Sequence, residues 1–462
     1  MVGLPARGKS YVTKKLCRYL SWLQHDTKIF NVGDRRRKIG QDVVTIPIIE
    51  SKSSQPSRIT DHASDHSAKF FNPENEEASQ LRERAAMGTL DELLDYLLYE
   101  GGCVSIFDAT NSTVKRRNLI MKNIRARAPD LQVMFLESQC PLESNMRFKL
   151  SGPDFKNQDH VSALKGFKQR VVMYEKQYVP LGVSEEKNGY PYCQMIDVGR
   201  KFVIHNISGS LATEAVHYLQ HSNLLPRQIW LTRHGESYDD AASRIGGDAE
   251  LTPLGVKYAE AIPRFIDNQR DAWDMSQREI ASSHENLPSE NLQRGTPADH
   301  IHKKFHVWTS MMLRSMQTAQ NFSPPEYQTK HLRMLDELNA GVLEGLTRDE
   351  VRDFYADWYR NRQKDKFHLR YPGTAGEGYL DVTNRLKSVI LEVESETDHV
   401  LLISGLAVTR ILLAYFRGLH SDGIADLHVP LGTLHVLEPK PYGVEYRVFV
   451  YNSETEWFDL KE

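Results

Sequence analysis

The chain has 462 residues, more than a single hydrophobic core usually accommodates, so two or possibly three domains are expected. Its 58 basic and 61 acidic residues nearly balance, which gives no whole-chain reason to expect nucleic acid or an anionic membrane as a partner. The four cysteines lack metal-ligand spacing, and no apolar run approaches the roughly 20 residues of a membrane span. We therefore expect a cytoplasmic protein with reduced thiols.

The chain opens with "GLPARGKS", which fits the phosphate-loop pattern G-x-x-x-x-G-K-[ST]. In that pattern backbone N–H groups surround a polyphosphate, the lysine neutralises its outer oxygens, and the hydroxyl binds magnesium. Val12, Leu16 and Leu20 follow at helical spacing, so the loop would lie at a helix N-terminus, where anions are favoured. Because only Met1 and Val2 precede the loop, we expect either that the strand leading into it is short or that the sequence begins late, and in both cases a loop that is less firmly held. The predicted nucleotide-binding residues are Gly3, Leu4, Pro5, Ala6, Arg7, Gly8, Lys9 and Ser10.

Apolar runs then alternate with amphipathic stretches, which is typical of an α/β domain. We expect buried parallel strands at "TKIFNVG", "CVSIFDATN", "QVMFLES" and "CQMIDVG". The Ser-rich stretch 38–69 is predicted to be a surface loop. Asp108 ends the second of these runs, where an acidic residue could join Ser10 in binding magnesium.

Basic residues follow the first strand in "DRRRK" and recur further along this half. Any one of them alone could be a solvated surface charge. As a set that could face one crevice, they suit a second phosphate beside the nucleotide. The set comprises Arg82, Arg116, Lys149 and Arg170.

The segment "LLPRQ" separates the last helix of the first half from a new strand, and we place a domain boundary near Ser222. This gives domains of 1–221 and 222–462. The second half again predicts strands, at "IWLTRHG", "HVWTS", "HVLLISG" and "LHVLEPK". The polar stretch from Asp271 to Lys304 is predicted to be an inserted loop.

In "LTRHGES" a strand ends at His234, with Arg233 before it. A lone histidine is more often a packed or surface residue. Here Arg244, Arg314 and Glu337 add the remaining parts of a phosphoryl-acceptor site. The imidazole would attack phosphorus, guanidinium groups would hold the oxygens, and a carboxylic acid would protonate the leaving alkoxide.

The order of motifs is specific: "GLPARGKSY", "NVGDRRR", "FFNPEN", "IFDATNST" and "FLESQC", then "RHGES", "RIGGD" and "LDELNAGV". Over nearly its whole length the chain resembles the bifunctional 6-phosphofructo-2-kinase/fructose-2,6-bisphosphatase family. The resemblance implies a P-loop kinase domain with a mainly parallel sheet, followed by a histidine-phosphatase (phosphoglycerate-mutase-like) α/β domain. It also implies ATP and Mg²⁺ as cofactors, fructose 6-phosphate as the kinase substrate, fructose 2,6-bisphosphate as its product, and a homodimer.

Carried across by position, the resemblance makes Asp108 the catalytic aspartate of the kinase, with Lys9 on the nucleotide and Ser10 on magnesium. His234 would be the phosphohistidine and Glu337 the acid of the phosphatase. The sugar-phosphate contacts implied in the first domain are Arg36, Arg82, Thr110, Arg116, Lys149, Arg170 and Tyr174. The binding groups of the second domain are Arg233, Arg244, Gly246, Arg314, Arg362, Lys366, Tyr379 and Arg410.

The departures from the family pattern fall in the second domain. "LLISGLAVTR" has Gly405 where the family has a second histidine, Asp240 replaces an asparagine, and Arg348 replaces a sugar-binding tyrosine. Losing one transition-state donor costs about 10² to 10³ in rate, and a carboxylate ~4 Å from a phosphate charge opposes it by roughly 4 kcal/mol at an effective dielectric of ~20. We therefore predict a weak or inactive bisphosphatase. Two alternatives stay open: a non-catalytic sugar-phosphate-binding regulator, or an active bisphosphatase with a rearranged site.

Overall fold

The computed structural model describes residues 1–5, 7–36, 75–139, 168–169, 171–197, 199–223, 225–285, 303–440 and 443–461. The chain divides into two compact units, Met1–Ser222 and Asn223–Glu462. Each unit is described by itself. The predicted surface loop at 38–69 lies outside the described residues.

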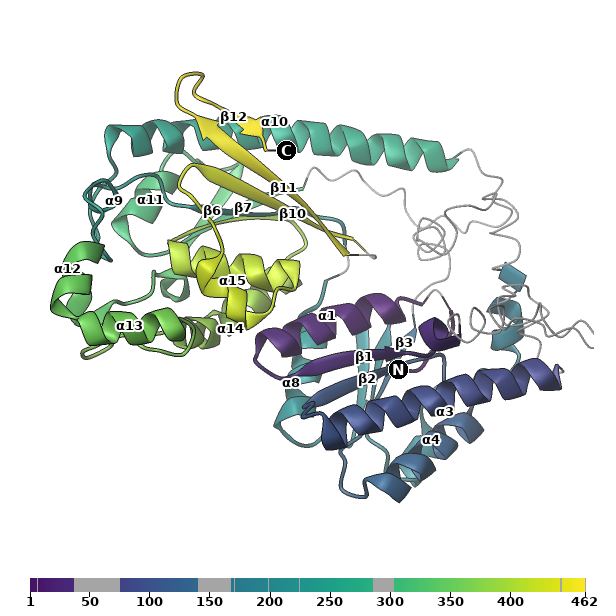
Figure 1. The fold of residues 1–462 in the computed structure, drawn as a ribbon. Coiled ribbons are helices and arrows are strands. Elements are labelled where there is room, and N and C mark those ends of the chain that lie inside the picture. The colour runs from purple at the N-terminus through teal and green to yellow at the C-terminus, as the bar shows by residue number, and fades with distance from the viewer. Residues whose placement is uncertain are drawn as a thin grey trace, which may run out of the picture. The chain divides into compact units, whose positions relative to one another are not determined.

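The first unit alternates strands and helices, as expected. Its elements in chain order are α1 (Lys9–Trp22), β1 (Thr27–Asn31), α3 (Glu76–Tyr99), β2 (Val104–Asp108), α4 (Val114–Arg127), β3 (Phe135–Gln139), α7 (Val183–Lys187), β4 (Tyr192–Ile196), β5 (Lys201–His205) and α8 (Ser210–His221) (Figure 1). The four predicted strands are β1 to β4, and both β1–β2 and β3–β4 are parallel pairs. The sequence did not predict β5, which pairs antiparallel with β4 at the sheet edge.

A short segment before the phosphate loop joins these strands. Val2 forms a parallel bridge with Glu137 of β3, and its N–H donates to the carbonyl of Leu136 at 2.7 Å. The N–H of Gly3 donates to Thr110, just after β2, at 3.0 Å. Val2 is fully buried in the core that α3 and α4 share with the strands. The segment leading into the loop is therefore paired with β3 and buried.

The second unit is built on one sheet. Its elements are β6 (Ile229–Arg233), α9 (Tyr238–Ala241), α10 (Pro253–Glu285), β7 (Phe305–Thr309), α11 (Leu313–Ala319), β8 (Tyr327–His331), η4 (Arg333–Leu335), η5 (Gly341–Leu343), α12 (Arg348–Phe354), α13 (Ala356–Lys364), α14 (Tyr379–Ser395), β9 (His399–Ser404), α15 (Leu406–Arg417), η6 (Ser421–Asp426), β10 (Thr433–Lys440), β11 (Gly443–Asn452) and β12 (Trp457–Leu460) (Figure 1).

Within the described residues the strand order is β12-β11-β10-β6-β9-β7-β8. The strands β6, β9, β7 and β8 are parallel, and β10, β11 and β12 continue the sheet antiparallel on the other side of β6. All six residues of β9 are buried, as expected of a strand covered on both faces. Arg233 at the end of β6 is in register with Ser404 at the end of β9. The residues that follow these two strands therefore meet at one edge of the sheet, where α/β proteins bind ligands.

The predicted inserted loop at Asp271–Lys304 is wrong for its first part, because α10 continues to Glu285. Residues 271–285 contain neither glycine nor proline, so nothing in this polar sequence ends the helix. Trp273 also fixes the helix by packing edge-on against His399, with ring centroids 4.7 Å apart. A polar sequence was mistaken for a loop although its polarity only marks a solvent-facing helix.

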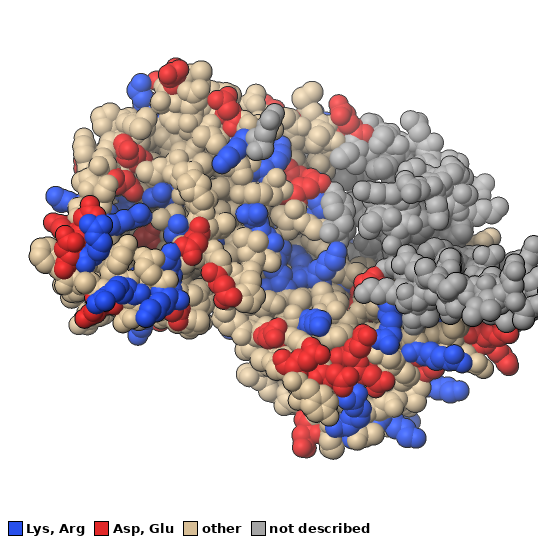
Figure 2. Space-filling model, viewed as in Figure 1, with Lys and Arg blue, Asp and Glu red and all other residues tan. Residues whose placement is uncertain are grey.

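Charge is mixed on the surface of this unit. Figure 2 shows acidic and basic side chains interspersed over α12 and α13. These helices carry the ion pairs Arg352–Asp349 and Arg360–Asp357. Among the described residues, the helices are too short or too polar to cross a membrane.

Candidate active sites

The phosphate loop of the first unit closes on itself through Lys9. The side chain of Lys9 is only 8% exposed, and its Nζ donates to the carbonyl oxygens of Gly3 at 2.8 Å and Leu4 at 2.6 Å. Gly8 precedes α1 in the left-handed conformation, at φ 82°, and a Cβ on Gly3 would lie 2.8 Å from the carbonyl oxygen of Ser138. The two glycines therefore allow the tight loop that places Lys9 at the start of α1.

Ser10 and Asp108 meet beside this loop. Ser10 Oγ donates to Asp108 Oδ2 at 3.1 Å, and Asn31 Nδ2 donates to the same oxygen at 2.9 Å. These residues come from the start of α1 and the ends of β2 and β1, so the parallel pairing of the strands brings them together. A hydroxyl and a carboxylate are oxygen ligands of the kind that Mg²⁺ prefers. The predicted metal-binding pair is thus in contact.

A cavity of about 320 Å³ adjoins the loop. It is lined by Leu4, Arg7, Ser138, Gln139, Tyr178, Ile196 and Asp197. Arg7 is held toward this region by Glu175, at 3.2 Å. The cavity therefore lies next to the residues predicted to bind the nucleotide.

Two of the predicted sugar-phosphate residues, Tyr174 and Arg116, affect the pKa of a third, Arg82. Burial lowers the pKa of Arg82, Tyr174 acts to raise it, and the charge of Arg116 lowers it further. Arg116 is also paired with Glu83. Thr110 accepts the Gly3 N–H through its carbonyl, and Arg36 lies in a helical segment at 32–36 after β1. Lys149 and Arg170, and Ala6 of the loop, lie outside the described residues.

In the second unit His234 is 3% exposed, directly after β6. Its Nδ1 is 2.8 Å from the carbonyl oxygen of Gly235, and the N–H of Gly235 donates to Thr318 Oγ1 at 2.9 Å. Burial, together with the positive charges of Arg314 and Arg233, lowers the pKa of His234 to about 3. The imidazole is therefore neutral at physiological pH, the state in which its nitrogen can be a nucleophile.

Asp240 connects to both Arg233 and His234. Its Oδ1 accepts from Arg233 Nη2 at 3.2 Å, and its Oδ2 lies 3.7 Å from His234 Nδ1. Ser237 donates to Oδ2 through its N–H at 3.1 Å and its Oγ at 2.5 Å, which makes Asp240 part of a capping box at α9. Burial acts to raise the pKa of Asp240, but His234, Ser237 and Arg233 together bring it below its ordinary value.

Glu337 lies against the start of α15. The peptide N–H of Ala407 is 3.1 Å from both Oε1 and Oε2 of Glu337. Its charge also acts on Arg233, together with Asp240, Arg410 and Arg314. The predicted nucleophile, acid and arginines therefore gather at one edge of the sheet.

Most of the remaining predicted binding residues have partners within this unit. Arg410 Nη1 donates to the Tyr379 hydroxyl at 2.9 Å, and the Arg362 guanidinium lies 5.9 Å from the Tyr379 ring centroid. Arg314 Nη1 donates to the carbonyl of Gly247 at 2.6 Å, next to Gly246. Lys366 is paired with Asp426.

Arg244 differs from these residues because it is exposed and its charge acts on Glu350. Sequence reasoning missed Thr318, which supports the turn after His234 and lies four residues after Arg314 on α11. The spacing of four along the predicted helix was the available signal.

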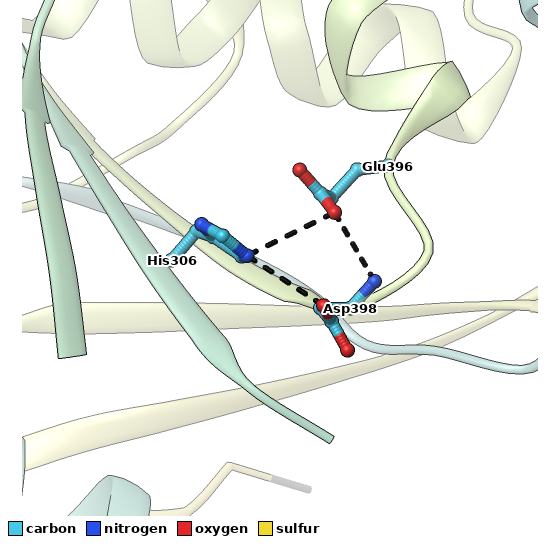
Figure 3. A group of neighbouring side chains, drawn as sticks. All are labelled: His306, Glu396 and Asp398. Atoms are coloured by element: carbon cyan, nitrogen blue, oxygen red, sulfur yellow. Dashed lines mark hydrogen bonds and ion pairs between the residues drawn. The ribbon is translucent and has the colours of Figure 1, made fainter. Parts of the chain in front are cut away.

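A separate group of metal-ligand types, His306, Glu396 and Asp398, joins β7 to the turn before β9 (Figure 3). His306 Nε2 lies 3.9 Å from Glu396 and 3.7 Å from Asp398. Glu396 Oε1 accepts the N–H groups of Thr397 and Asp398, and Asp398 accepts the N–H of Lys304. These contacts describe a turn that is tied to a neighbouring strand.

Comparison with protein families matches residues 1–226 to the 6-phosphofructo-2-kinase family and residues 290–452 to the histidine phosphatase superfamily (branch 1). The predicted fold class, a P-loop kinase domain followed by a histidine-phosphatase domain, is confirmed.

Similar proteins are alike over nearly the whole chain. A Schizosaccharomyces pombe protein named "Probable 6-phosphofructo-2-kinase" is 45% identical, over 99% of this chain and 70% of its own length. The "6-phosphofructo-2-kinase 1" of Saccharomyces cerevisiae is 43% identical, over 99% of this chain and 52% of its own length. The human "6-phosphofructo-2-kinase/fructose-2,6-bisphosphatase 3" is 36% identical, over 98% of this chain and 77% of its own length. With both domains matched in this order, the chain belongs to the 6-phosphofructo-2-kinase/fructose-2,6-bisphosphatase family.

Proposed function

We propose that the protein transfers the γ-phosphoryl group of ATP to the 2-hydroxyl of fructose 6-phosphate and so makes fructose 2,6-bisphosphate, a role in the control of glycolysis and gluconeogenesis. The observation that carries this proposal is the contact of Ser10 with Asp108 at 3.1 Å, beside the loop that holds Lys9. The kinase names of the relatives support it.

The nucleotide would lie along the loop, residues 3–10, with its base directed to the cavity lined by Leu4 and Tyr178. Ser10 and Asp108 would hold Mg²⁺, which when bound neutralises charge on the outer phosphate oxygens. Lys9 would have to exchange its two carbonyl partners for phosphate oxygens. Asp108 would orient the sugar 2-hydroxyl and accept its proton.

The sugar phosphate would be bound beside the nucleotide. Arg116 and Tyr174 both affect the pKa of Arg82, which supports a shared binding surface for these three residues. The two guanidinium groups of such a surface would suit a phosphate dianion. Arg36, Thr110, Lys149 and Arg170 complete the proposed set.

For the second unit we propose weak or absent bisphosphatase activity. His234 is neutral and flanked by Arg233 and Arg314, so the nucleophile is retained. Asp240, however, already occupies Arg233, at 3.2 Å. In this proposal the kinase domain is 1–221 and the phosphatase-like domain is 222–462, and Arg244, Gly246, Arg362, Lys366, Tyr379 and Arg410 remain proposed binding residues.

We further propose a cytoplasmic protein whose partners are small molecules and whose assembled form is a homodimer. The near balance of charge and the absence of a membrane-spanning helix from the described residues are in keeping with this.

The experiment that tests the kinase proposal is incubation of the purified full chain with ATP, Mg²⁺ and fructose 6-phosphate, with the 2,6-bisphosphate as the measured product. ATP turnover that depends on fructose 6-phosphate is expected. Binding of both substrates without turnover would instead favour the sugar-phosphate-binding regulator. The pairing of Val2 with β3 counts against that alternative, because it anchors the phosphate loop.

A further inference from the structure

The room beside Gly405 is filled by Glu337. A Cβ built on Gly405 would lie 2.1 Å from Glu337 Oε2, 2.6 Å from its Cδ and 2.9 Å from its Cβ. The φ of Gly405 is -84°, a conformation open to any residue, so the backbone does not require glycine here. What requires it is the position of the Glu337 side chain.

The carboxylate of Glu337 is held in that position from two sides. Both of its oxygens lie 3.1 Å from the N–H of Ala407, in the first turn of α15, where the helix favours negative charge. On the other side, the N–H of Leu338 donates to Glu337 Oε1 at 2.7 Å. The side chain is therefore placed on α15 as a bound anion would be.

The carboxylate of Asp240 is also held by neighbouring side chains. Arg233, Ser237 and the imidazole of His234 all lie within 3.7 Å of its carboxylate oxygens. A phosphate bound for attack by His234 would need the same guanidinium. Asp240 is thus paired with a group that the substrate requires.

The charges of the pocket can be counted from these residues. Arg233, Arg314 and Arg410 contribute three positive charges, and Asp240 and Glu337 remove two, which leaves one. The Nε atoms of Arg233 and Arg314 are buried without a hydrogen-bond partner among the described residues. The pocket therefore keeps hydrogen-bond donors for an anion, but the carboxylates of Asp240 and Glu337 offset most of the positive charge of its arginines.

Resting on the weak phosphatase activity proposed above, we propose that the histidine pocket is self-occupied. Asp240 holds Arg233 in place of a substrate phosphate, and Glu337 fills the room beside Gly405 at the start of α15. A phosphate ester then enters only by displacing these carboxylates. While Glu337 lies on α15, it is also held away from its proposed role as the acid for the leaving oxygen.

The placement of Glu337 can be tested by stability. Gly405→Ala should lower the thermal midpoint of the full chain by about 3 °C or more, because the new methyl group displaces the Glu337 side chain. In a Glu337→Ala background the same substitution should lower the thermal midpoint much less, because the carboxylate contacts at 2.1 and 2.6 Å are gone and only the Cβ contact at 2.9 Å remains. Equal shifts in the two backgrounds would overturn the assigned role of Gly405.

The charge argument can be tested by titrating inorganic phosphate into the full chain in a Lys9→Ala background, which weakens binding at the first unit. Asp240→Asn and Glu337→Gln should each tighten phosphate binding by about tenfold or more. Asp422→Asn, an exposed carboxylate of η6, is the matched control and should leave it unchanged. Adding Arg233→Ala to Asp240→Asn should abolish the gain.

The outcomes separate this inference from the proposed function. Slow release of phosphate from fructose 2,6-bisphosphate, with phosphate affinity unchanged in both variants, would reject self-occupation and leave the weak phosphatase standing. Rapid release by the parent would reject both. Tightened binding that survives Arg233→Ala would assign the gain to another site and also reject the inference.

Discussion

The two predicted phosphate sites hold their cationic groups in different ways. In the first unit Lys9 donates to the carbonyl oxygens of Gly3 and Leu4, which are neutral and belong to the loop itself. In the second unit Arg233 donates to Asp240, a carboxylate. A neutral carbonyl gives up a lysine to phosphate more readily than a carboxylate gives up an arginine, because only the carboxylate competes in charge. The comparison shows that retained motif residues can have different partners: neutral carbonyls at one predicted site and a carboxylate at the other.

The same contrast extends to the acidic residues. Asp108 of the first unit contacts neutral donors, Ser10 and Asn31, and is placed to share a metal ion with the hydroxyl. Glu337 of the second unit is held by the start of α15, at Ala407. Asp108 therefore lies at the proposed magnesium site, whereas Glu337 is hydrogen-bonded to the backbone at the start of α15.

The first test of the contrast between the two units measures the rate of fructose 2,6-bisphosphate synthesis, where we expect the largest effect. Lys9→Ala should reduce the kinase rate by about 10² to 10³, because it removes a preorganised charge from the transferring phosphoryl group. Lys14→Ala, an exposed lysine on the same helix, is the matched control and should retain the parental rate. Product formation by Lys9→Ala at the parental rate would show that the loop does not bind the nucleotide as proposed.

A second test restores the phosphatase pattern. Gly405→His combined with Asp240→Asn should raise release of inorganic phosphate from fructose 2,6-bisphosphate by about 10², because it adds a donor, frees Arg233 and forces Glu337 off α15. His234→Ala in the same background should abolish the gain. If the parent already releases phosphate rapidly through His234, other residues replace the missing donor and the contrast between the two sites fails.

A third test concerns the arginines of the first unit. Arg82→Ala should raise the Michaelis constant for fructose 6-phosphate by about tenfold or more and leave that for ATP nearly unchanged, because a charge-assisted hydrogen bond is worth about 1.5–3 kcal/mol. Arg84→Ala, an exposed neighbour on α3, serves as the control. An equal rise for both substrates would point to a structural role for Arg82. Arg170, predicted to act with it, can be assayed in the same way.

Local patterns in the sequence were sufficient to identify the family and to anticipate much of the fold. Asp108 was expected at a strand end and lies at the end of β2, and the strands β6, β7, β9 and β10 follow apolar runs in the sequence. Strand β11 was missed, because it begins by alternating exposed with partly buried residues and so has no apolar run. Polarity likewise hid the far end of α10.

The site shows a sharper limit of sequence reasoning. Gly405 and Asp240 could be recognised as departures from the family pattern. The placement of Glu337 on Ala407 could not, because the two residues are 70 positions apart and their contact depends on the packing of α15. The sequence indicated that Gly405 removes a hydrogen-bond donor. The structure adds that the side chain of Glu337 fills the space beside Gly405.

The last test concerns the dependence of stability on pH. Burial and the charges of Arg314 and Arg233 lower the pKa of His234 to about 3, whereas an unfolded chain would give it a pKa near ~6.5. Between these values the unfolded state binds a proton that the folded state does not. The contribution of His234 to stability is therefore fully present above about pH 6.5 and is lost as the pH falls toward 3, by about 1.4 kcal/mol for each pH unit.

Urea unfolding followed from pH 7 to pH 4.5 can measure this loss. The parent should lose stability with falling pH more steeply than His234→Ala, which no longer carries the buried imidazole. His435 is also buried, and its pKa is lowered to about 4, so His234→Ala should remove only part of the slope. His420→Ala, an exposed histidine, should keep the parental slope. Identical slopes in the parent and His234→Ala would mean that the pKa of His234 is not lowered in the folded protein, because only a group whose pKa differs between the folded and unfolded states contributes to the slope. That result would contradict the burial of the imidazole between Arg233 and Arg314 on which the comparison of the two units rests.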